Sequence, residues 1–541
     1  MTRPDGTHAD GTLAGLGRVV RLILRLDRAR LAVWVGVTTA VIVGSAASLL
    51  AAYPDQAAID AYGLMMGDNP ALAAFAGPGY GMDAPNIGVI LVNEVQLWGL
   101  VTVALMSVFL VNRHTRAEED AERADLLRST VVGRHTISAA TVFVVTVAHV
   151  VLAAACGVGF VALGYSATGS VALALSYLVT GWMFVGVALV AAQLAGTGRG
   201  SLGLASSTLG LVFVVRAAGD TAGSPVRWLS PLAWPLSVRA FAGEQWWVLA
   251  LTAAFGATLV TAGLWLSTRR DLGSGRLVPG RGPDRAGSAL RHPFGFALHL
   301  HRWTIASWTA GMFVLGAVYG SVADDIAQMM KDNPLYVELL GQAGGGADAT
   351  DSYLSTVIVI QALLVTGYVI SAVLIPHHEE SVSRVEVILA STLGRRRWLG
   401  AYLAVAALGA TLATVASGVG TGLSVAATTG DWDQVGRLTA AGLVPLPAVA
   451  VIGASAVVLY GWWPRAVQAA WGALAAVTVM AILAEVLRIP AWIRQLSPFT
   501  HLPMVPAESL RWPPLLWLSV LACALTVIGV GGFLRRDIQA H

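Results

Sequence analysis

The sequence predicts an all-α integral membrane protein with about twelve transmembrane helices, and three observations lead to this fold class. The chain is 56% hydrophobic and only 12% charged, whereas soluble proteins carry about 25% charged residues. Its mean hydropathy is +0.69. Its apolar runs reach about 18 residues, the length at which a helix can cross a bilayer, and they lack the ten-residue alternation of a membrane β-barrel.

The chain repeats itself, with six predicted spans in each half. Three pairs of short motifs recur in the same order, outside the charged segments described below. They are MMGDNPALAAFAG (65–77) with MMKDNPLYVELLG (329–341), RWLSP (227–231) with RQLSP (494–498), and Arg269-Arg270-Asp271 with Arg535-Arg536-Asp537. Because six is an even number, the halves have the same orientation, and parallel repeats of this kind place a pathway at their interface.

Each half is predicted to start with an amphipathic helix on the membrane surface. In the first half this helix covers 13–31, where Arg18, Arg21, Arg25 and Arg28 recur every three or four residues opposite an apolar face. The predicted regions are a tail and surface helix (1–30), a first six-helix half (31–267), a linker with a second surface helix (268–303) and a second six-helix half (304–541).

The predicted spans follow from the apolar runs. In order, they are 31–53, 87–111, 136–164, 172–196, 202–219, 246–267, 304–322, 353–376, 399–425, 438–460, 466–487 and 514–534. With the N-terminus inside, most of the 34 Lys and Arg residues fall on the inner side. We therefore expect a multi-pass protein of the cell membrane with both termini in the cytoplasm. No basic patch of the kind that binds nucleic acid is apparent in the sequence.

Two charged segments stand out between the second and third predicted spans of each half. The first charged segment is 118–135, EEDAERADLLRSTVVGRH, and the second charged segment is 379–396, EESVSRVEVILASTLGRR. They match without a gap at Glu118/Glu379, Glu119/Glu380, Arg123/Arg384, Asp125/Glu386, Leu127/Ile388, Gly133/Gly394 and Arg134/Arg395. The pattern predicts a short helix across the inner membrane surface, with its charges presented to a partner. Gly133 and Gly394 would end it, and Arg134 and Arg395 would anchor the next span at the headgroups.

A Glu-rich segment ending in Gly-Arg between the second and third of six spans, after an N-terminal surface helix, resembles the type-2 ABC export permeases. The duplicated twelve-span form is similar to actinobacterial permeases that export polyketide antibiotics, and the likeness covers essentially the whole chain. The common form of the segment has Pro near its end, where this chain has Gly133 and Gly394. The resemblance implies an exporter of hydrophobic or amphiphilic small molecules that confers drug or antibiotic resistance.

The resemblance also implies how such an exporter would be powered. In that family the loop after the second span is the coupling helix, which docks on a separate ATP-binding subunit. The chain has no Gly-x-x-x-x-Gly-Lys-Ser/Thr motif, and its sole lysine is Lys331. We therefore expect no catalytic site and no cofactor in this chain, with ATP and Mg²⁺ bound by two copies of the partner. The residues that match this coupling helix by position are expected to contact the ATP-binding subunit. They are Glu118, Glu119, Arg123, Asp125, Gly133 and Arg134 in the first segment, and Glu379, Glu380, Arg384, Glu386, Gly394 and Arg395 in the second.

Polar residues within the spans are costly in lipid and are candidates for the substrate pathway. Asn93, Glu94 and Gln96 lie in the outer part of the second span, and Gln361 is the nearest equivalent in the second half. Two roles remain open for them: a wall of the pathway, or hydrogen bonds between helices. His149 in the third span suits an interhelical hydrogen bond better than a proton relay.

Two other functions compete with ATP-driven export. A proton-coupled multidrug transporter would need a titratable relay in the membrane, for which Glu94 and His149 are the only candidates in the spans. A membrane enzyme acting on lipid-linked substrates would need paired carboxylates or a metal cluster in its loops, and we recognise neither in the sequence.

Overall fold

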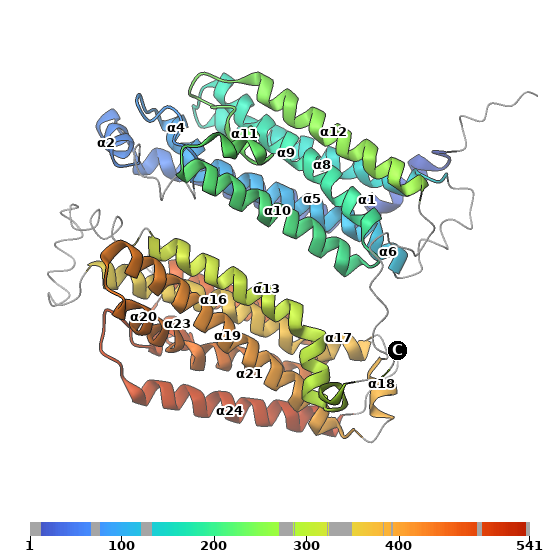
Figure 1. Cartoon of the computed structure of the whole chain (residues 1–541), viewed down its shortest axis with the longest axis vertical. Coiled ribbons are helices and arrows are strands. Elements are labelled where there is room, and N and C mark those ends of the chain that lie inside the picture. Colours follow the sequence, from blue (N-terminus) through green and yellow to red (C-terminus); the bar gives the residue numbers. More distant parts are fainter. Residues whose placement is uncertain are drawn as a thin grey trace, which may run out of the picture. The chain divides into compact units, whose positions relative to one another are not determined.

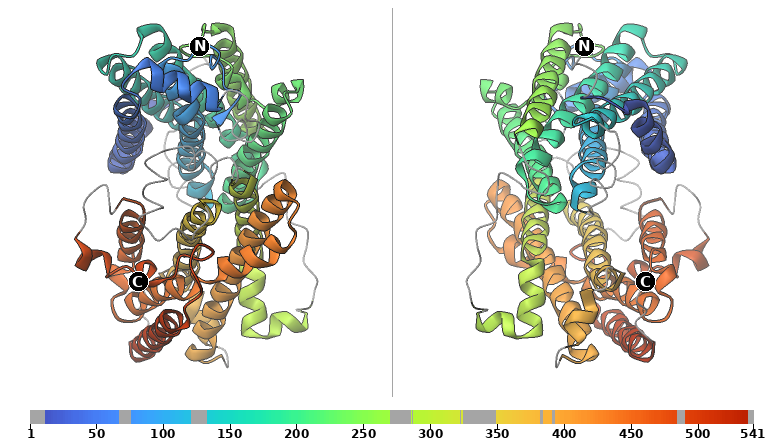
Figure 2. Two further views of the ribbon diagram at one scale, coloured as in Figure 1. Left: turned by 90° about the vertical axis from the view of Figure 1, so that its left-hand side faces the viewer. Right: turned by 90° about the vertical axis from the view of Figure 1, so that its right-hand side faces the viewer.

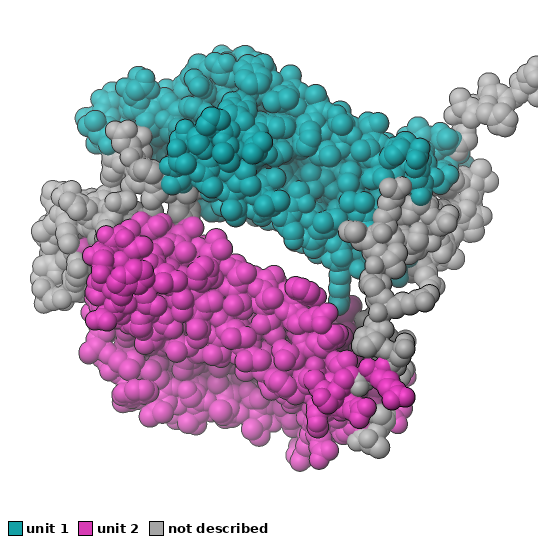
Figure 3. Space-filling model, in the orientation of Figure 1, with its two compact units in different colours: residues 1–281 teal, residues 282–541 magenta. Residues whose placement is uncertain are grey.

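The computed structural model of the chain is a protein of helices. It describes residues 12–66, 76–120, 133–269, 285, 287–321, 323, 349–381, 384–390, 393–483 and 490–536. The chain forms two compact units, Met1–Arg281 and Gly282–His541 (Figure 3). The division between them falls within the stretch 268–303.

The first unit is built from six long helical elements that run along one another (Figure 1). The second element has a π-helical turn, η1, between its two α-helical parts, and short helices lie in the connections. The long elements are α1 (Leu16–Ala52), α4–η1–α5 (Ile87–Leu91, Val92–Gln96, Leu97–His114), α8 (Thr136–Ala162), α9 (Ala167–Leu194), α10 (Gly198–Thr221) and α12 (Trp246–Thr268). The short ones are α2 (Gln56–Met66), α6 (Arg116–Asp120), η2 (Pro225–Leu229) and α11 (Ala233–Leu236).

The second unit repeats this plan. Its long helices are α13 (Pro293–Ser321), α16 (Ala349–Val373), α19 (Arg395–Thr429), α21 (Leu446–Trp462), α22 (Ala469–Leu483) and α24 (Trp512–Arg535). Its short helices are η3 (Ser288–Arg291), α17 (Ile375–Ser381), α18 (Arg384–Leu389), α20 (Asp433–Leu443), η4 (Pro464–Ala466), α23 (Ala491–Arg494) and η5 (Pro498–His501).

Equivalent helices pack against equivalent neighbours in the two units. In the first unit α1 packs on α8, α5 packs on α8, α9 and α10, and α9 packs on α10 and α12. In the second unit α13 packs on α19, α16 packs on α19, α21 and α22, and α21 packs on α22 and α24. The sequence repeat is therefore also a repeat in three dimensions, and the most central helices are α5 and α9 in the first unit and their equivalents α16 and α21 in the second.

Ten helices among the described residues are long and apolar enough to cross a membrane. The predicted spans 304–322 and 466–487 fall on α13 and on the shorter α22. The outward side of α24 carries exposed large apolar side chains, among them Leu516, Val520 and Val527. Exposed apolar faces of this size suit contact with lipid, and the protein is an all-α integral membrane protein.

The first predicted surface helix is not a separate element. It is continuous with the first predicted span in α1, because no proline interrupts the sequence there and the helical hydrogen bonds can continue. The second is likewise part of α13, although Figure 2 shows the first turns of α13 bending away from the rest of the helix.

Small residues allow α13 and α19 to pack closely. A Cβ atom on Gly316 would lie 2.1 Å from the carbonyl oxygen of Ser417, and one on Gly320 would lie 2.4 Å from that of Thr421. Only glycine fits at these two positions, which lie four residues apart on one helix face. This is the small-residue packing by which membrane helices associate without a hydrophobic driving force.

Candidate functional site: the two charged segments and a groove beside Glu94

The first charged segment begins where α5 ends. After His114 and one further residue the chain forms α6, which carries Glu118 and Glu119. Both side chains are half-buried. Arg123 and Asp125 fall in 121–132, outside the described residues. The described part of the segment is thus a short helix that prolongs the second span of the first unit.

A buried arginine ties α6 to the beginning of α10. Arg116 is only 1% exposed, and its Nη1 donates to Glu119 Oε2 at 2.8 Å, while its Nε lies 3.7 Å from Asp120 Oδ1. Its Nη2 donates to the carbonyl oxygen of Gly196, and Asp120 accepts from the backbone N–H of Gly198. Charge-assisted hydrogen bonds of this kind are among the stronger ones in proteins. The sequence analysis missed Arg116, although it stands only two residues before Glu118.

A second buried charge holds the same end of α5 against α1. Asp27 is 1% exposed and accepts from His114 Nε2 at 2.6 Å, from Arg113 Nε at 3.2 Å and from Arg30 Nη1 at 3.0 Å. Asp27 is the single carboxylate of α1, and it was not singled out from the sequence. A single acidic residue among the arginines of an amphipathic helix was the feature of the sequence that could have indicated this buried ion pair.

The end of the first charged segment is fastened at two places. The Gly133 N–H donates to the carbonyl oxygen of Ala14 at 3.0 Å, so the segment's end lies against the residues just before α1. Arg134 Nη2 donates to the carbonyl oxygen of Thr268, the last residue of α12, at 2.7 Å. The last carbonyls of a helix lack partners inside it and carry partial negative charge, which a cation stabilises.

The second charged segment continues from α16 through α17 and α18. Glu380 on α17 is paired with Arg536 through two hydrogen bonds of 2.7 and 2.6 Å, and it also accepts from the Tyr460 hydroxyl at 2.9 Å. Tyr460 lies near the end of α21, and Arg536 directly follows α24. The bidentate pair therefore ties the segment to the last helix of the unit.

The Gly-Arg pair at the end of the second charged segment makes contacts similar to those of Gly133-Arg134 at the end of the first. Gly394 is the N-cap residue of α19, and Arg395 Nη1 donates to the carbonyl oxygen of Arg536 at 3.0 Å, at the end of α24. In both units, the arginine after this glycine therefore caps the C-terminal end of the last long helix. The sequence analysis placed these arginines at the headgroups and did not foresee this contact.

The candidate coupling residues differ in how much surface they offer a partner. Glu119 and Glu380 have ionic partners inside their own unit, and Glu118 and Glu379 are half-buried. Glu386 on α18 is exposed, as are Arg134 and Gly394. The side chain of Arg384 is outside the described part of the chain. Of the acidic residues described in the two segments, Glu386 and Asp120 are exposed, and Asp120 already binds Gly198.

The polar residues of the second span lie in and around its π-helical turn, Val92–Gln96. Gln96 is fully buried and donates to Ser176 Oγ at 3.2 Å and to the Pro235 carbonyl oxygen at 3.0 Å. Gln361 is buried too and donates to Thr421 Oγ1 at 3.3 Å. These two glutamines make hydrogen bonds between elements of their own unit, which is the structural role that the sequence analysis left open.

Asn93 and Glu94 meet a tyrosine from the short helix α2. Asn93 Nδ2 donates to the Tyr62 hydroxyl oxygen at 2.8 Å, and that hydroxyl donates to Glu94 Oε1 at 2.5 Å. Asn93 is buried, whereas Glu94 is exposed and lines a groove of about 510 Å³ between α1 and the η1–α5 segment. Of the four candidate pathway residues, Glu94 faces open space.

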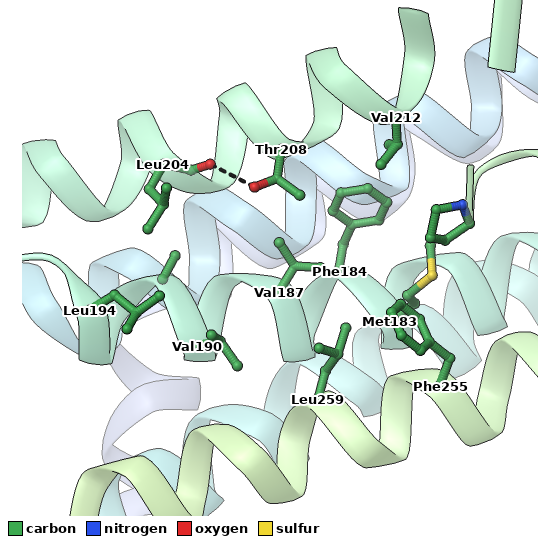
Figure 4. Close-up of a pocket in the computed structure, with 12 residues that line it drawn as sticks. Met183, Phe184, Val187, Val190, Leu194, Leu204, Thr208, Val212, Phe255 and Leu259 are labelled. Carbon is green, nitrogen blue, oxygen red and sulfur yellow. Dashed lines mark hydrogen bonds between the residues drawn. The ribbon is translucent and has the colours of Figure 1, made fainter. Parts of the chain in front are cut away.

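A second cavity of the first unit is almost purely apolar. It encloses about 240 Å³ between α9, α10 and α12, among side chains such as Phe184, Val187 and Leu259 (Figure 4). Its one hydroxyl, on Thr208, donates to the carbonyl oxygen of Leu204 one turn earlier at 2.9 Å. The cavity therefore offers dispersion contacts and few polar ones.

The first unit has a further buried carboxylate that was not singled out from the sequence. Asp220, near the end of α10, is 7% exposed and lies 3.1 Å from Arg216 Nη1 and 3.3 Å from Arg227 Nη1. The spacing of Arg216 and Asp220, four residues apart on a helix, was the missed signal. Arg227 belongs to the repeated RWLSP motif, so this motif has a structural role at the end of α10.

His149 has the interhelical role that the sequence suggested. Its Nδ1 lies 2.7 Å from the carbonyl oxygen of Val145, and its Nε2 lies 3.2 Å from Ser107 Oγ. The ring is buried between α8, α5 and α9.

Comparisons with known proteins found one family model and one similar permease. A family model described as "Multidrug efflux system permease Rv1217c, C-terminal domain" matches residues 290–534. The multidrug efflux system permease protein Rv1217c of Mycobacterium tuberculosis (strain ATCC 25618 / H37Rv) is 34% identical over 544 residues, which cover 99% of this chain and 98% of that protein. The similarity therefore extends over both units. The chain belongs to the family of multidrug efflux permeases that Rv1217c represents.

Proposed function

We propose that this chain is the transmembrane permease subunit of an ATP-driven exporter of hydrophobic or amphiphilic small molecules. Two copies of a separate ATP-binding subunit would dock on the two charged segments and would hold the ATP and Mg²⁺. Membership of a multidrug efflux permease family supports the transport of drug-like molecules. The apolar cavity beside Phe184 and the groove beside Glu94 support substrates with a large apolar surface.

The observation that carries this proposal is the way both charged segments are joined to their units. Each prolongs the second long helical element of its unit, α5 or α16, and each is tied by ion pairs or hydrogen bonds to further helices. A partner that moves such a segment would move several spans with it. A free surface loop would transmit no such force, so rigid attachment is the property that coupling to ATP hydrolysis requires.

The same proposal places both segments and both termini in the cytoplasm of a cell whose membrane holds the protein. The arginine-rich stretches of α1 and of 268–303 support this orientation through their positive charge. A single cysteine introduced at the exposed position Arg199, on a background without Cys156 and Cys523, would react with a membrane-impermeant maleimide only in inverted vesicles. Reaction in intact cells would reverse the orientation.

The test of coupling uses charge reversal within the two segments. The full chain is purified with the ATP-binding subunit encoded beside it, and complex formation and ATP hydrolysis are measured for wild type, for Glu386→Arg, and for Glu386→Arg combined with Asp125→Arg. We expect the single variant to weaken docking at one segment and the double variant to abolish stimulated hydrolysis. Glu386 is the better choice than Glu380, because reversing Glu380 would break its pair with Arg536 and disturb the permease itself.

Asp83→Arg is the matched control, because Asp83 is exposed in a turn before α4, at the opposite end of the span from α6. It should assemble and hydrolyse ATP like wild type. If no ATP-binding subunit associates with the wild-type chain, or if the double variant keeps full complex formation and hydrolysis, ATP-driven coupling through these segments is excluded.

A further inference from the structure

The groove beside Glu94 combines apolar walls with a single charged group. α1 contributes Val33, Trp34, Val37 and Val41 to its walls, and the η1–α5 segment contributes Trp98. Thr38, Ser45 and Thr102 are its other polar lining residues, and the lining side chains described include no lysine, arginine or histidine. Glu94 therefore faces this space without a cation from the protein beside it in the lining.

The position of Glu94 makes its charge unusual. It lies seven residues after Ile87, the first residue of its span, so it is about 10 Å along the helix from that end. Carboxylates at such depth in membrane proteins usually pair with a cation or mark a pathway. This one lies in the π-helical turn Val92–Gln96 and lines the groove, and π-turns occur frequently at functional sites.

The neighbours of Glu94 hold it as a hydrogen-bond acceptor. Asn93 donates to the Tyr62 oxygen, so the Tyr62 proton is directed to Glu94 Oε1. Burial, followed by the Glu94 charge, raises the pKa of the Tyr62 hydroxyl well above its usual range, so the hydroxyl remains a donor. Tyr62 occupies one carboxylate oxygen and leaves Oε2 to a ligand in the groove. A single hydrogen bond offsets only a small part of the free energy that a carboxylate loses when apolar walls replace water around it.

We propose that the groove binds a lipophilic monocation, with its charge at Glu94 and its apolar body between α1 and α5. The proposal rests on the function proposed above and names the substrate class of this unit. The indole rings of Trp34 and Trp98 line the groove, and such rings attract cations electrostatically, while the valines of α1 suit hydrocarbon. The second unit has no equivalent carboxylate, since Gln361 there is buried and donates to Thr421. The described residues of the second unit therefore offer no carboxylate at the matching position.

The test measures binding to the permease alone. The full chain, without ATP-binding subunits, is placed in lipid nanodiscs, and equilibrium binding of tetraphenylphosphonium is compared with binding of neutral triphenylphosphine oxide. Glu94→Gln retains the size of the side chain and its acceptor for Tyr62 and removes only the charge. We expect it to weaken tetraphenylphosphonium binding by about tenfold or more and to leave the neutral probe within about twofold. Glu94→Asp should retain most of the preference for the cation.

Two further variants make the result specific. Asp83→Asn removes an exposed carboxylate outside the groove and should bind both probes like wild type. Trp98→Leu should weaken cation binding by about two- to fivefold through the lost aromatic face. Equal binding of the cation by wild type and Glu94→Gln would overturn the proposal. If Glu94→Gln did not fold, a wild-type preference for the cation of less than about twofold would overturn it as well.

The outcome separates this site from the proposed function. Binding is measured without ATP, so a wild-type chain that supports ATP-driven efflux but shows no preference for the cation over the neutral probe would refute the groove site alone. Conversely, charge-selective binding at Glu94 in a chain that recruits no ATP-binding subunit would leave the site standing and refute ATP-driven coupling. An apolar groove that merely holds lipid acyl chains would bind both probes alike in every variant, and that result also refutes the cation site.

Discussion

The two charged segments share a sequence pattern, and yet they are fastened to different parts of their units. In the first, Arg116 forms ion pairs with Glu119 and Asp120 within α6 and a hydrogen bond to Gly196, just before α10. Asp27 of α1 binds His114 at the adjacent end of α5. In the second, Glu380 reaches the end of α24 through Arg536 and the end of α21 through Tyr460. The contact of Arg134 or Arg395 with the last helix of the unit is common to both.

This difference teaches that the repeated motif marks where the segments lie, while residues outside the motif decide what holds them. Besides the last long helix of its unit, the first segment is attached near the beginnings of α1 and α10, and the second is attached to α21. A force applied at the two segments would therefore reach partly different helices. If ATP drives the protein as proposed, the two halves should respond unequally to ATP binding by the partner, although their spans pack in the same pattern.

The largest effect should come from Arg116→Met. The substitution removes a buried cation from Glu119 and Asp120 and breaks the bond to Gly196, so it should destabilise the first unit by about 3–5 kcal/mol. Hydrogen exchange should accelerate at amides 116–120 and at the first turn of α10. Arg199→Met, on the exposed side of the same end of α10, is the control and should change neither. Unchanged protection in Arg116→Met would show that α6 does not depend on this anchor.

Asp27→Asn should have the next largest effect. The amide retains the shape of the side chain and loses the charge that His114, Arg113 and Arg30 share, so about 1.5–3 kcal/mol of stability should be lost. Amide hydrogen exchange should become faster only at the end of α5 and in the facing turns of α1. Exchange in α17 should not change. Equal acceleration in α17 would mean that the two segments do not have independent anchors.

Arg536→Lys should cost less, about 1–2 kcal/mol, because it retains the charge and loses only the two-pronged contact with Glu380. Exchange should accelerate in α17 and not in α6. A double-mutant cycle with Glu380→Gln should yield a coupling energy of similar size. Purely additive effects would show that the pair contributes little to holding the second segment.

The smallest effects should come from Arg134→Ala and Arg395→Ala, and they should be equal. Each arginine caps the carbonyl end of the last helix at a partly exposed position, which is worth about 0.3–1 kcal/mol. Thermal unfolding of the two single variants provides the measurement. A cost several times larger in one of them would mean that even this common contact differs between the halves.

The features of the fold that depend on hydrophobicity, namely the helical spans and their approximate ends, were predictable from the sequence. Long apolar runs must be helical in lipid, because every backbone polar group needs a partner within the segment. The ends of α8, α9 and α12 therefore fall within a few residues of the predicted spans. The continuity of α1 was not predicted, because an amphipathic pattern followed by an apolar one does not reveal whether the helix is interrupted between them.

The candidate site was predictable only in part. Internal repetition located the two charged segments, and polarity within an apolar span singled out the residues around Glu94. Neither signal revealed Arg116, Asp27 or Asp220. Glu119 and Glu380 were expected to present their charges to a partner, whereas each has an ionic partner within its own unit. Neither the groove at Glu94 nor the contact with Tyr62 has a signature in the sequence, since the two residues come from different helices.

The sequence by itself determined the membrane location, the helical class, the repeat and the positions of the charged segments. These depend on composition and periodicity, which act residue by residue along the chain. Only the tertiary structure decided which charge binds which, because an ion pair such as Glu380–Arg536 joins residues far apart in the sequence. Its formation depends on how helices pack, and packing is a property of surfaces brought together in three dimensions.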